Sequence, residues 1–287
     1  MPELEQAPIE AAPQKPAAER YFVRFTREQR YLHAVLFSTF LGLAATGLPL
    51  RFSESIWARG LAGAVGGFGA ILFFHKLCAL VLTVAFLIHV KEVFTRGLYR
   101  REKGIFWGAT SMVANWKDAK DLFGHLRWFV GLGPKPQFER YAYWEKFDYW
   151  AVFWGMIVIG FSGYAMWFAP FFARFLPGWA LNAALVIHSE EGLLAILFIF
   201  SIHFVNTHLR PDSFPMDMVI FTGVESEKEF QHKRPTEYAR LAKEGKLESR
   251  IGEAPATWFV NLSRIVGFTA IAIGITLLVL TLTAYFH

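Results

Sequence analysis

Long apolar runs alternate with charged segments along the whole chain. A membrane-spanning helix needs roughly 20 predominantly apolar residues. Five runs reach or approach that length: about Tyr31–Leu50, Phe68–Phe94, Asp148–Ala169, Ala180–His208 and Phe259–Phe286. The pattern therefore predicts an all-α membrane protein with five transmembrane helices.

Composition supports this fold class and excludes several kinds of site. Hydrophobic residues make up 54% of the 287 residues and aromatic residues 17%, which excludes an ordinary soluble domain. The only cysteine is Cys78. A lone thiol excludes an intrachain disulfide, a covalently attached CxxCH haem and a cysteine-ligated iron–sulfur cluster. We interpret Cys78 as a small buried apolar residue.

The basic residues are distributed unequally between the two sides of the predicted bundle. Connections on one side carry 23 Lys and Arg residues, in segments 1–30, 95–146 and 209–258. The two connections on the other side, 51–67 and 170–179, carry 3. The positive-inside rule therefore predicts a cytoplasmic N-terminus and an external C-terminus. We interpret the net charge of +5 as this topology signal, and nucleic-acid binding is not expected.

The segments outside the apolar runs have their own predicted roles. Residues 1–30 are predicted to form a disordered cytoplasmic arm without a cleavable signal peptide, because their first 20 residues contain no apolar core. The aromatic 95–146 connection is amphipathic and is expected along the membrane surface, with His125 as a surface histidine. Residues 211–257 form a charged cytoplasmic segment. Residues 258–287 are predicted to form a fifth transmembrane helix with a scaffold or partner-docking role.

Histidines inside the apolar runs are the candidate functional residues. Polar groups at membrane depth are costly and usually functional. His188 and His203 are fifteen residues apart, so on an α-helix they lie within about 60° of one face and roughly 22 Å apart along the axis. His75 and His89 are fourteen residues apart, which gives about 40° and roughly 21 Å.

Alternating helix directions place these histidines at two depths. His75 and His188 fall near the outer surface, whereas His33, His89 and His203 fall near the inner surface. Haem iron takes two axial imidazoles from flanking helices of a bundle. Residues 31–210 are therefore predicted to form a four-helix domain that binds two stacked b haems. Two histidine ligands leave no open position on the iron, which favours electron transfer over oxygen activation.

Three sequence motifs resemble one family of membrane cytochromes. They are R-x-x-H at Arg30–His33 followed by TGLPL, the stretch GLGPKPQFERYAYWEKFDYW before the third helix, and IHSEEG at the start of the fourth. The chain is similar here to the cytochrome b subunits of membrane formate dehydrogenases, nickel–iron hydrogenases and thiosulfate reductases. The resemblance covers about residues 24–210, so the fifth helix lies outside the family's four-helix core.

The resemblance implies ligand pairs, and one histidine departs from it. It implies that His75 pairs with His188 at the outer haem and that His33 pairs with His203 at the inner haem. His89 is an additional inner histidine. Its presence also fits the scheme of quinol–cytochrome c oxidoreductases, in which His89 would replace His33. A third alternative is a third haem held by His89 with His208, because α-helical geometry puts His208 about 140° from His203.

A quinone site is predicted where the fourth helix meets the inner surface. Asn206, His208, Arg210 and Asp212 cluster there, and histidine and aspartate supply the hydrogen bonds and protons that quinone reduction needs. The alternative is a helix end anchored by polar residues. Glu190 and Glu191, beside His188, are candidates for a second quinone site.

The sequence thus predicts a multi-pass electron-transfer subunit of a respiratory oxidoreductase in a prokaryotic inner membrane. It would pass electrons between membrane quinone and a periplasmic redox partner. The resemblance implies an iron–sulfur, molybdenum or nickel enzyme, or a multihaem cytochrome c, as that partner. The alternative function is a proton or metal-ion transporter that uses the intramembrane histidines.

Overall fold

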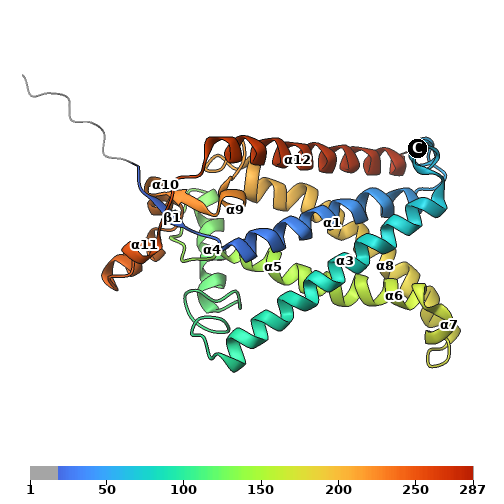
Figure 1. Cartoon of the computed structure of the whole chain (residues 1–287), viewed down its shortest axis with the longest axis horizontal. Coiled ribbons are helices and arrows are strands. Elements are labelled where there is room, and N and C mark those ends of the chain that lie inside the picture. The colour runs from blue at the N-terminus through green and yellow to red at the C-terminus, as the bar shows by residue number, and fades with distance from the viewer. Residues whose placement is uncertain (1–18, 287) are drawn as a thin grey trace, which may run out of the picture.

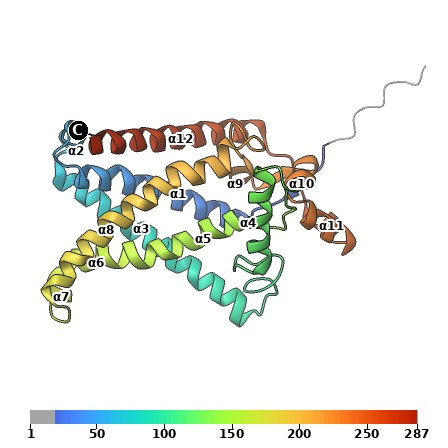
Figure 2. The same cartoon turned by 180° about the vertical axis from the view of Figure 1, so that it is seen from behind.

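A computed structural model describes residues 19–286 as a bundle of long helices with a small cap at one end (Figures 1 and 2). Five helices are long and apolar enough to span a membrane, as the sequence predicts. They are α1 (Arg27–Arg51), α3 (Phe68–Phe94), α5 (Tyr143–Gly155) extended by η2 (Met156–Gly160) and α6 (Phe161–Trp167), α8 (Gly178–Phe198) extended by η3 (Ile199–His203) and η4 (Val205–Leu209), and α12 (Thr257–Phe286).

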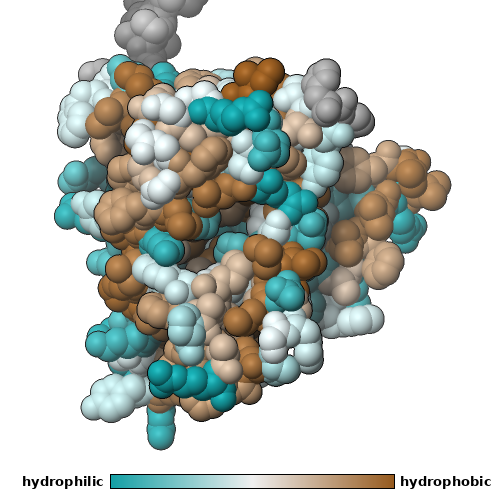
Figure 3. Space-filling model, turned by 90° about the vertical axis from the view of Figure 1, so that its right-hand side faces the viewer, coloured by the Kyte–Doolittle hydropathy of each residue, from teal (hydrophilic) through white to brown (hydrophobic). Residues whose placement is uncertain are grey.

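We call the end at which α1 and α12 begin the inner end, and the opposite end the outer end (Figure 1). Thr26 caps α1 there, because its hydroxyl accepts a hydrogen bond from the Gln29 amide while the Gln29 side chain accepts one from the Thr26 amide. The short helices α2 (Ile56–Val65) and α7 (Ala169–Phe172) lie at the outer end. The side that faces the viewer in Figure 3 is this outer end, and its surface is hollowed near the centre.

Small residues set the close approach of the helices. A Cβ on Gly42 of α1 would lie 2.6 Å from the Cys78 sulfur of α3, so Cys78 packs directly on the α1 backbone. Gly274 of α12 likewise leaves space for the rings of Phe200 and Phe204, because a Cβ there would lie within 3.0 Å of both rings. Outward-facing side chains of α3 are apolar and exposed, including Leu77, Leu80 and Leu87. A face of this kind suits contact with lipid.

Three short strands and two helices close the inner end. Strand β1 (Tyr21–Val23) lies between β2 (Val224–Ser226) and β3 (Ile251–Gly252) in an antiparallel sheet. Helices α10 (Glu227–Lys233) and α11 (Pro235–Lys243) pack beside it around Phe22, Phe230 and Leu241. We call these five elements the inner cap. The 3₁₀ turn η5 (Glu248–Arg250) leads into β3.

The inner cap corrects the predicted boundaries of the N-terminal arm. The sequence predicts a disordered segment over residues 1–30, but Tyr21–Val23 are a strand and α1 already begins at Arg27. The order comes from pairing with residues about 200 positions later, which the local composition does not reveal. The part of the predicted arm from 1 to 18 lies outside the described residues.

Helix α4 (Trp116–Phe129) runs across the inner end, roughly perpendicular to the bundle (Figures 1 and 2). Phe123, Leu126 and Phe129 expose apolar surface along it, as an interfacial helix does. His125 differs from its prediction as a surface residue, because it is only 7% exposed. Its ring stacks on Phe129 and hydrogen-bonds to the Tyr143 hydroxyl at 3.1 Å. The short helices η1 (Thr95–Tyr99) and α9 (Val219–Thr222) complete the described elements.

Candidate functional site

One large cavity runs through the bundle between α1, α3, α5–α6 and α8. Its volume is about 2070 Å³. An ordinary small-ligand pocket measures about 300–1,000 Å³, so the space is sufficient for more than one large ligand. Six histidines line the cavity: His33, His75, His89, His188, His203 and His208. All five candidate haem ligands predicted from the sequence therefore face one continuous space.

The outer pair of histidines is the best-defined feature of this cavity. His75 lies on α3 and His188 on α8, and their ring centroids are 6.1 Å apart with the planes at 79°. An imidazole nitrogen binds a first-row metal at about 2.0–2.1 Å and lies roughly 1.1 Å from the ring centre, so two opposed ligands have centroids about 6 Å apart. The observed separation matches that of two axial ligands on one metal.

Hydrogen bonds occupy the same nitrogen in both rings. His75 Nδ1 lies 2.9 Å from the Thr46 hydroxyl, which in turn donates to the Gly42 carbonyl at 2.6 Å. Thr46 therefore accepts from His75 Nδ1–H. His188 Nδ1 lies 2.9 Å from the Ile159 carbonyl, which can only accept. Both rings thus carry their proton on Nδ1 and present an unprotonated Nε2, the arrangement that metal-ligating histidines adopt.

Two glycines make room for these rings. A Cβ on Gly163 would lie 2.9 Å from His188 Cε1, and a Cβ on Gly47 would lie 3.2 Å from His75 Cε1. Gly163 is one helical turn beyond Ile159, so its missing side chain lets the His188 ring reach the Ile159 carbonyl. That carbonyl belongs to the π-helical turn η2, and such turns interrupt the regular backbone ladder.

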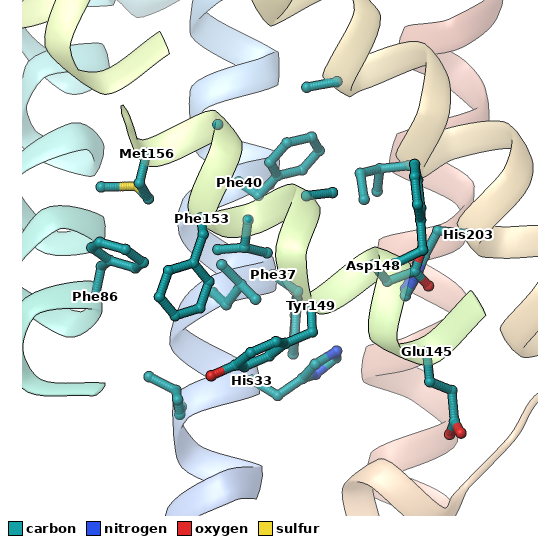
Figure 4. Close-up of a pocket in the computed structure, with 18 of the residues that line it drawn as sticks. His33, Phe37, Phe40, Phe86, Glu145, Asp148, Tyr149, Phe153, Met156 and His203 are labelled. Carbon is teal, nitrogen blue, oxygen red and sulfur yellow. The ribbon is translucent and has the colours of Figure 1, made fainter. Parts of the chain in front are cut away.

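The inner end of the cavity contains a histidine held by a carboxylate. His203 Nδ1 lies 2.9 Å from Asp148 Oδ2. Figure 4 shows these two side chains beside each other, with the His33 ring directed toward the same part of the pocket. His33, His203 and His208 all line this cavity.

His89, the additional inner histidine, is engaged elsewhere. Its Nε2 lies 2.9 Å from the Tyr149 hydroxyl, and its ring meets the Tyr149 and Phe153 rings edge-on. In His188 and His203 the hydrogen-bonded nitrogen is Nδ1, which leaves Nε2 free. In His89 it is Nε2 that is hydrogen-bonded. The structure brings His33 toward His203 and places His89 against α5.

The four residues of the predicted quinone site separate into two groups. Asn206, His208 and Arg210 line the cavity. Asp212 does not, because its carboxylate binds Lys135 at 2.6 Å and faces His232 at 3.4 Å. The Lys135 ammonium holds the pKa of Asp212 below its ordinary value. Asp212 is thus an ion-pair residue of the inner surface.

His208 lies on a different face of the fourth helix from the one that regular α-helical geometry predicts. An α-helix would place it about 140° from His203. However, residues 199–203 and 205–209 form π-helical turns, in which residues five apart lie one turn apart. Both histidines consequently face the cavity. The Nδ1 atom of His208 is buried and has no hydrogen-bond partner among the described residues.

The outer carboxylates have fixed partners. Glu190 forms an ion pair with Arg51 at 2.9 Å, and Arg51 also contacts Ser189 and the Tyr285 hydroxyl. Glu191 accepts a hydrogen bond from Trp154 at 3.3 Å and lines the cavity. Only Glu191 of the two predicted candidates therefore faces the cavity.

Sequence reasoning missed the buried charges at the inner mouth. Arg24, Arg234 and Glu237 are each less than 10% exposed. Arg24 pairs with Glu145 at 3.2 Å, and Glu237 pairs with Arg140 at 3.2 Å. These contacts join the inner cap to α5 and to the segment before it. No local signal marks them, because charge-rich segments are usually solvated.

Comparison with known proteins does not identify a family for this chain. No protein-family model matches the sequence, and no curated protein matches it significantly. The functional conclusion therefore depends on the geometry of the cavity.

Proposed function

We propose that this chain is a di-haem cytochrome b that carries electrons between membrane quinone and an external redox partner. The His75–His188 pair carries the proposal. Its centroid separation of 6.1 Å suits opposed axial ligands, and both rings have their Nδ1 hydrogen-bonded. Haem bound by these histidines would supply reversible one-electron chemistry.

The chain's own residues divide the work of holding the two haems. His75 and His188 would hold the outer one, with Thr46 and Ile159 orienting the rings. His203 would hold the inner one, with Asp148 as its orienting partner. We assign His33 as the second inner ligand because the Nε2 atom of His89 already contacts Tyr149. A third haem that uses His89 would require that contact to break.

Haem content per polypeptide tests this assignment directly. Purified protein, expressed with ample haem, should contain two haems by the pyridine haemochrome assay, and His188→Ala should contain one. His232→Ala is the matched control, since His232 is exposed and does not line the cavity. Colourless wild-type protein, or a His188→Ala protein that keeps both haems, would refute the proposal. Colourless protein would favour the transporter alternative.

The quinone site belongs at the inner end in this proposal. Asn206, His208 and Arg210 face the cavity, and the Nδ1 of His208, which has no hydrogen-bond partner among residues 19–286, would suit a quinone carbonyl. His208→Ala should retain both haems but lose quinol-dependent haem reduction. Asp212→Asn serves as the control, because Asp212 lies outside the cavity. Unchanged quinol-dependent reduction in His208→Ala would remove His208 from the site.

The partner and the membrane follow from the same proposal. Bis-histidine haems would carry electrons without reducing a substrate themselves, so we propose that an external redox partner exchanges electrons with them. The resemblance to dehydrogenase, hydrogenase and thiosulfate reductase subunits points to a periplasmic iron–sulfur, molybdenum or nickel enzyme, or a multihaem cytochrome c. We accordingly propose a prokaryotic inner membrane, with the inner end of the bundle at the cytoplasm.

A further inference from the structure

The two ends of the cavity differ in what accepts the histidine proton. At the outer end both acceptors are neutral: the Thr46 hydroxyl and the Ile159 carbonyl. At the inner end the acceptor of the His203 proton is the Asp148 carboxylate, at 2.9 Å. The hydrogen-bond acceptors of the histidines therefore change from neutral groups at the outer end of the cavity to a carboxylate at the inner end.

The Asp148 carboxylate lies beside His203 in a sheltered position. Its side chain is 15% exposed, and its Oδ1 atom is buried without a hydrogen-bond partner. Among residues 19–286, no Lys or Arg nitrogen lies within ion-pair distance of this carboxylate, and its hydrogen-bond partner is the Nδ1 atom of His203. No direct ion pair therefore neutralises this carboxylate, and a charge acts more strongly in an apolar interior than in water.

A carboxylate behind a ligating histidine changes the metal that the histidine holds. The charge-assisted hydrogen bond makes the imidazole a stronger donor and fixes its orientation. A stronger donor and a nearby negative charge both favour the more positive oxidation state of the iron. The reduction potential at the inner end should accordingly be lower than at the outer end, where neutral acceptors act more weakly.

We infer that Asp148 is a positioning residue that makes the inner haem site the lower-potential one, so that electrons flow from inner to outer. This inference rests on the proposed function. A quinol oxidised at the inner end gives up two electrons and two protons and becomes a quinone. The electrons leave one at a time toward the outer end and reduce a one-electron centre, a haem or an iron–sulfur cluster, of the external partner. The protons leave to the inner aqueous side.

Potentiometric titration of the purified holoprotein, followed by absorbance, tests the inference. Wild-type protein should show two midpoint potentials. Asp148→Asn keeps the shape of the side chain but removes its charge, and should raise only the lower potential. We expect at least a tenfold change in the ratio of reduced to oxidised haem at a fixed potential, which is about 59 mV for a one-electron couple. A shift of the higher potential, or of neither, would overturn the inference.

Thr46→Val provides an independent assignment of the outer site, because it removes the hydroxyl that accepts the His75 proton. It should raise only the higher potential. If Asp148→Asn loses its inner haem, this variant still decides the matter, because a shift of the lower potential in Thr46→Val would place that potential at the outer end. Asp148→Glu, which restores the charge, should lie closer to wild type. Wild-type protein without haem would refute the proposed function, which is a separate result.

Discussion

Replacement of Gly163 by alanine tests the outer site with a single added carbon. The new Cβ would lie 2.9 Å from His188 Cε1 and 3.1 Å from His188 Nδ1. The ring must retreat by about 0.5 Å to restore an ordinary contact of 3.4 Å, and functional sites tolerate displacements of only about 0.5 Å. The movement would also stretch the 2.9 Å hydrogen bond from His188 to the Ile159 carbonyl.

The expected loss is in haem binding more than in folding. Changes to the groups behind a metal ligand typically reduce metal affinity about 10- to 100-fold. Overpacking costs about 1–3 kcal/mol, and alanine recovers about 0.5–1 kcal/mol of that through its higher helix propensity. Gly163→Ala should therefore remain folded in detergent but lose most of its outer haem during gel filtration.

Two other glycines make the experiment a graded series. Gly160→Ala, on the same transmembrane segment, places its Cβ 3.9 Å from Met156 Cε, which is an ordinary contact. Gly47→Ala requires the His75 ring to move by only about 0.2 Å to reach 3.4 Å. Haem retained per polypeptide should fall in the order Gly160→Ala, Gly47→Ala, Gly163→Ala. Full haem content with an unchanged spectrum in Gly163→Ala would refute the geometry assigned to His188.

Three further predictions concern the inner end. His89→Ala should keep both haems, whereas His33→Ala should keep one by the haemochrome assay; the opposite result would make His89 the inner ligand. Burial, aided by the charges of Lys135 and Arg210, lowers the pKa of His125. The unfolded chain then takes up a proton below about pH 6.5 that the folded protein resists, so stability should fall as the pH drops. Thermal unfolding at pH 7.5 and pH 5.5 should show a smaller drop for His125→Phe than for wild type, and an equal drop would contradict this. Glu237→Gln should destabilise the inner cap by about 3 kcal/mol, because it leaves the largely buried Arg140 without its carboxylate partner, whereas Arg234 keeps Glu225. Limited proteolysis should detect the loss, with little change in Glu248→Gln, whose pair with Arg20 is exposed.

The long helices could be predicted from the sequence because the membrane imposes a simple rule. A span needs a continuous apolar stretch, and no other element satisfies backbone groups in lipid as simply. The outer histidines were also predictable, because His75 and His188 lie on regular α-helix and their depths follow from the rise per residue. Their acceptors were not, because Thr46 and Ile159 become relevant only once α1 and α5–α6 pack against those rings.

The inner end was harder to predict for two physical reasons. Its fourth helix changes to π-helical turns near His203, so a phase calculated at 100° per residue fails for His208. The inner end is closed by β1, which pairs with strands about 200 residues later in the chain. A three-residue strand is too short to show a periodic pattern in the sequence, so this pairing could not be predicted. The role of Asp148 could not be predicted for a similar reason. In the sequence it is a polar residue at the start of an apolar run, and only the packing of two helices places it beside His203.

The four helices of the core supply the histidines of the cavity and the groups that orient them, whereas the fifth helix supplies apolar wall residues. Helices α3 and α8 supply His75, His188 and His203, while α1 and α5–η2 supply the acceptors that orient them. Helix α12 contributes Gly267, Ala270 and Ile271 to the cavity wall, all of them apolar. Its Gly274 allows Phe200 and Phe204 to pack beside His203. Helix α12 thus acts on the inner site only through packing, and polar substitutions there should change the stability of the bundle before they change the ligands.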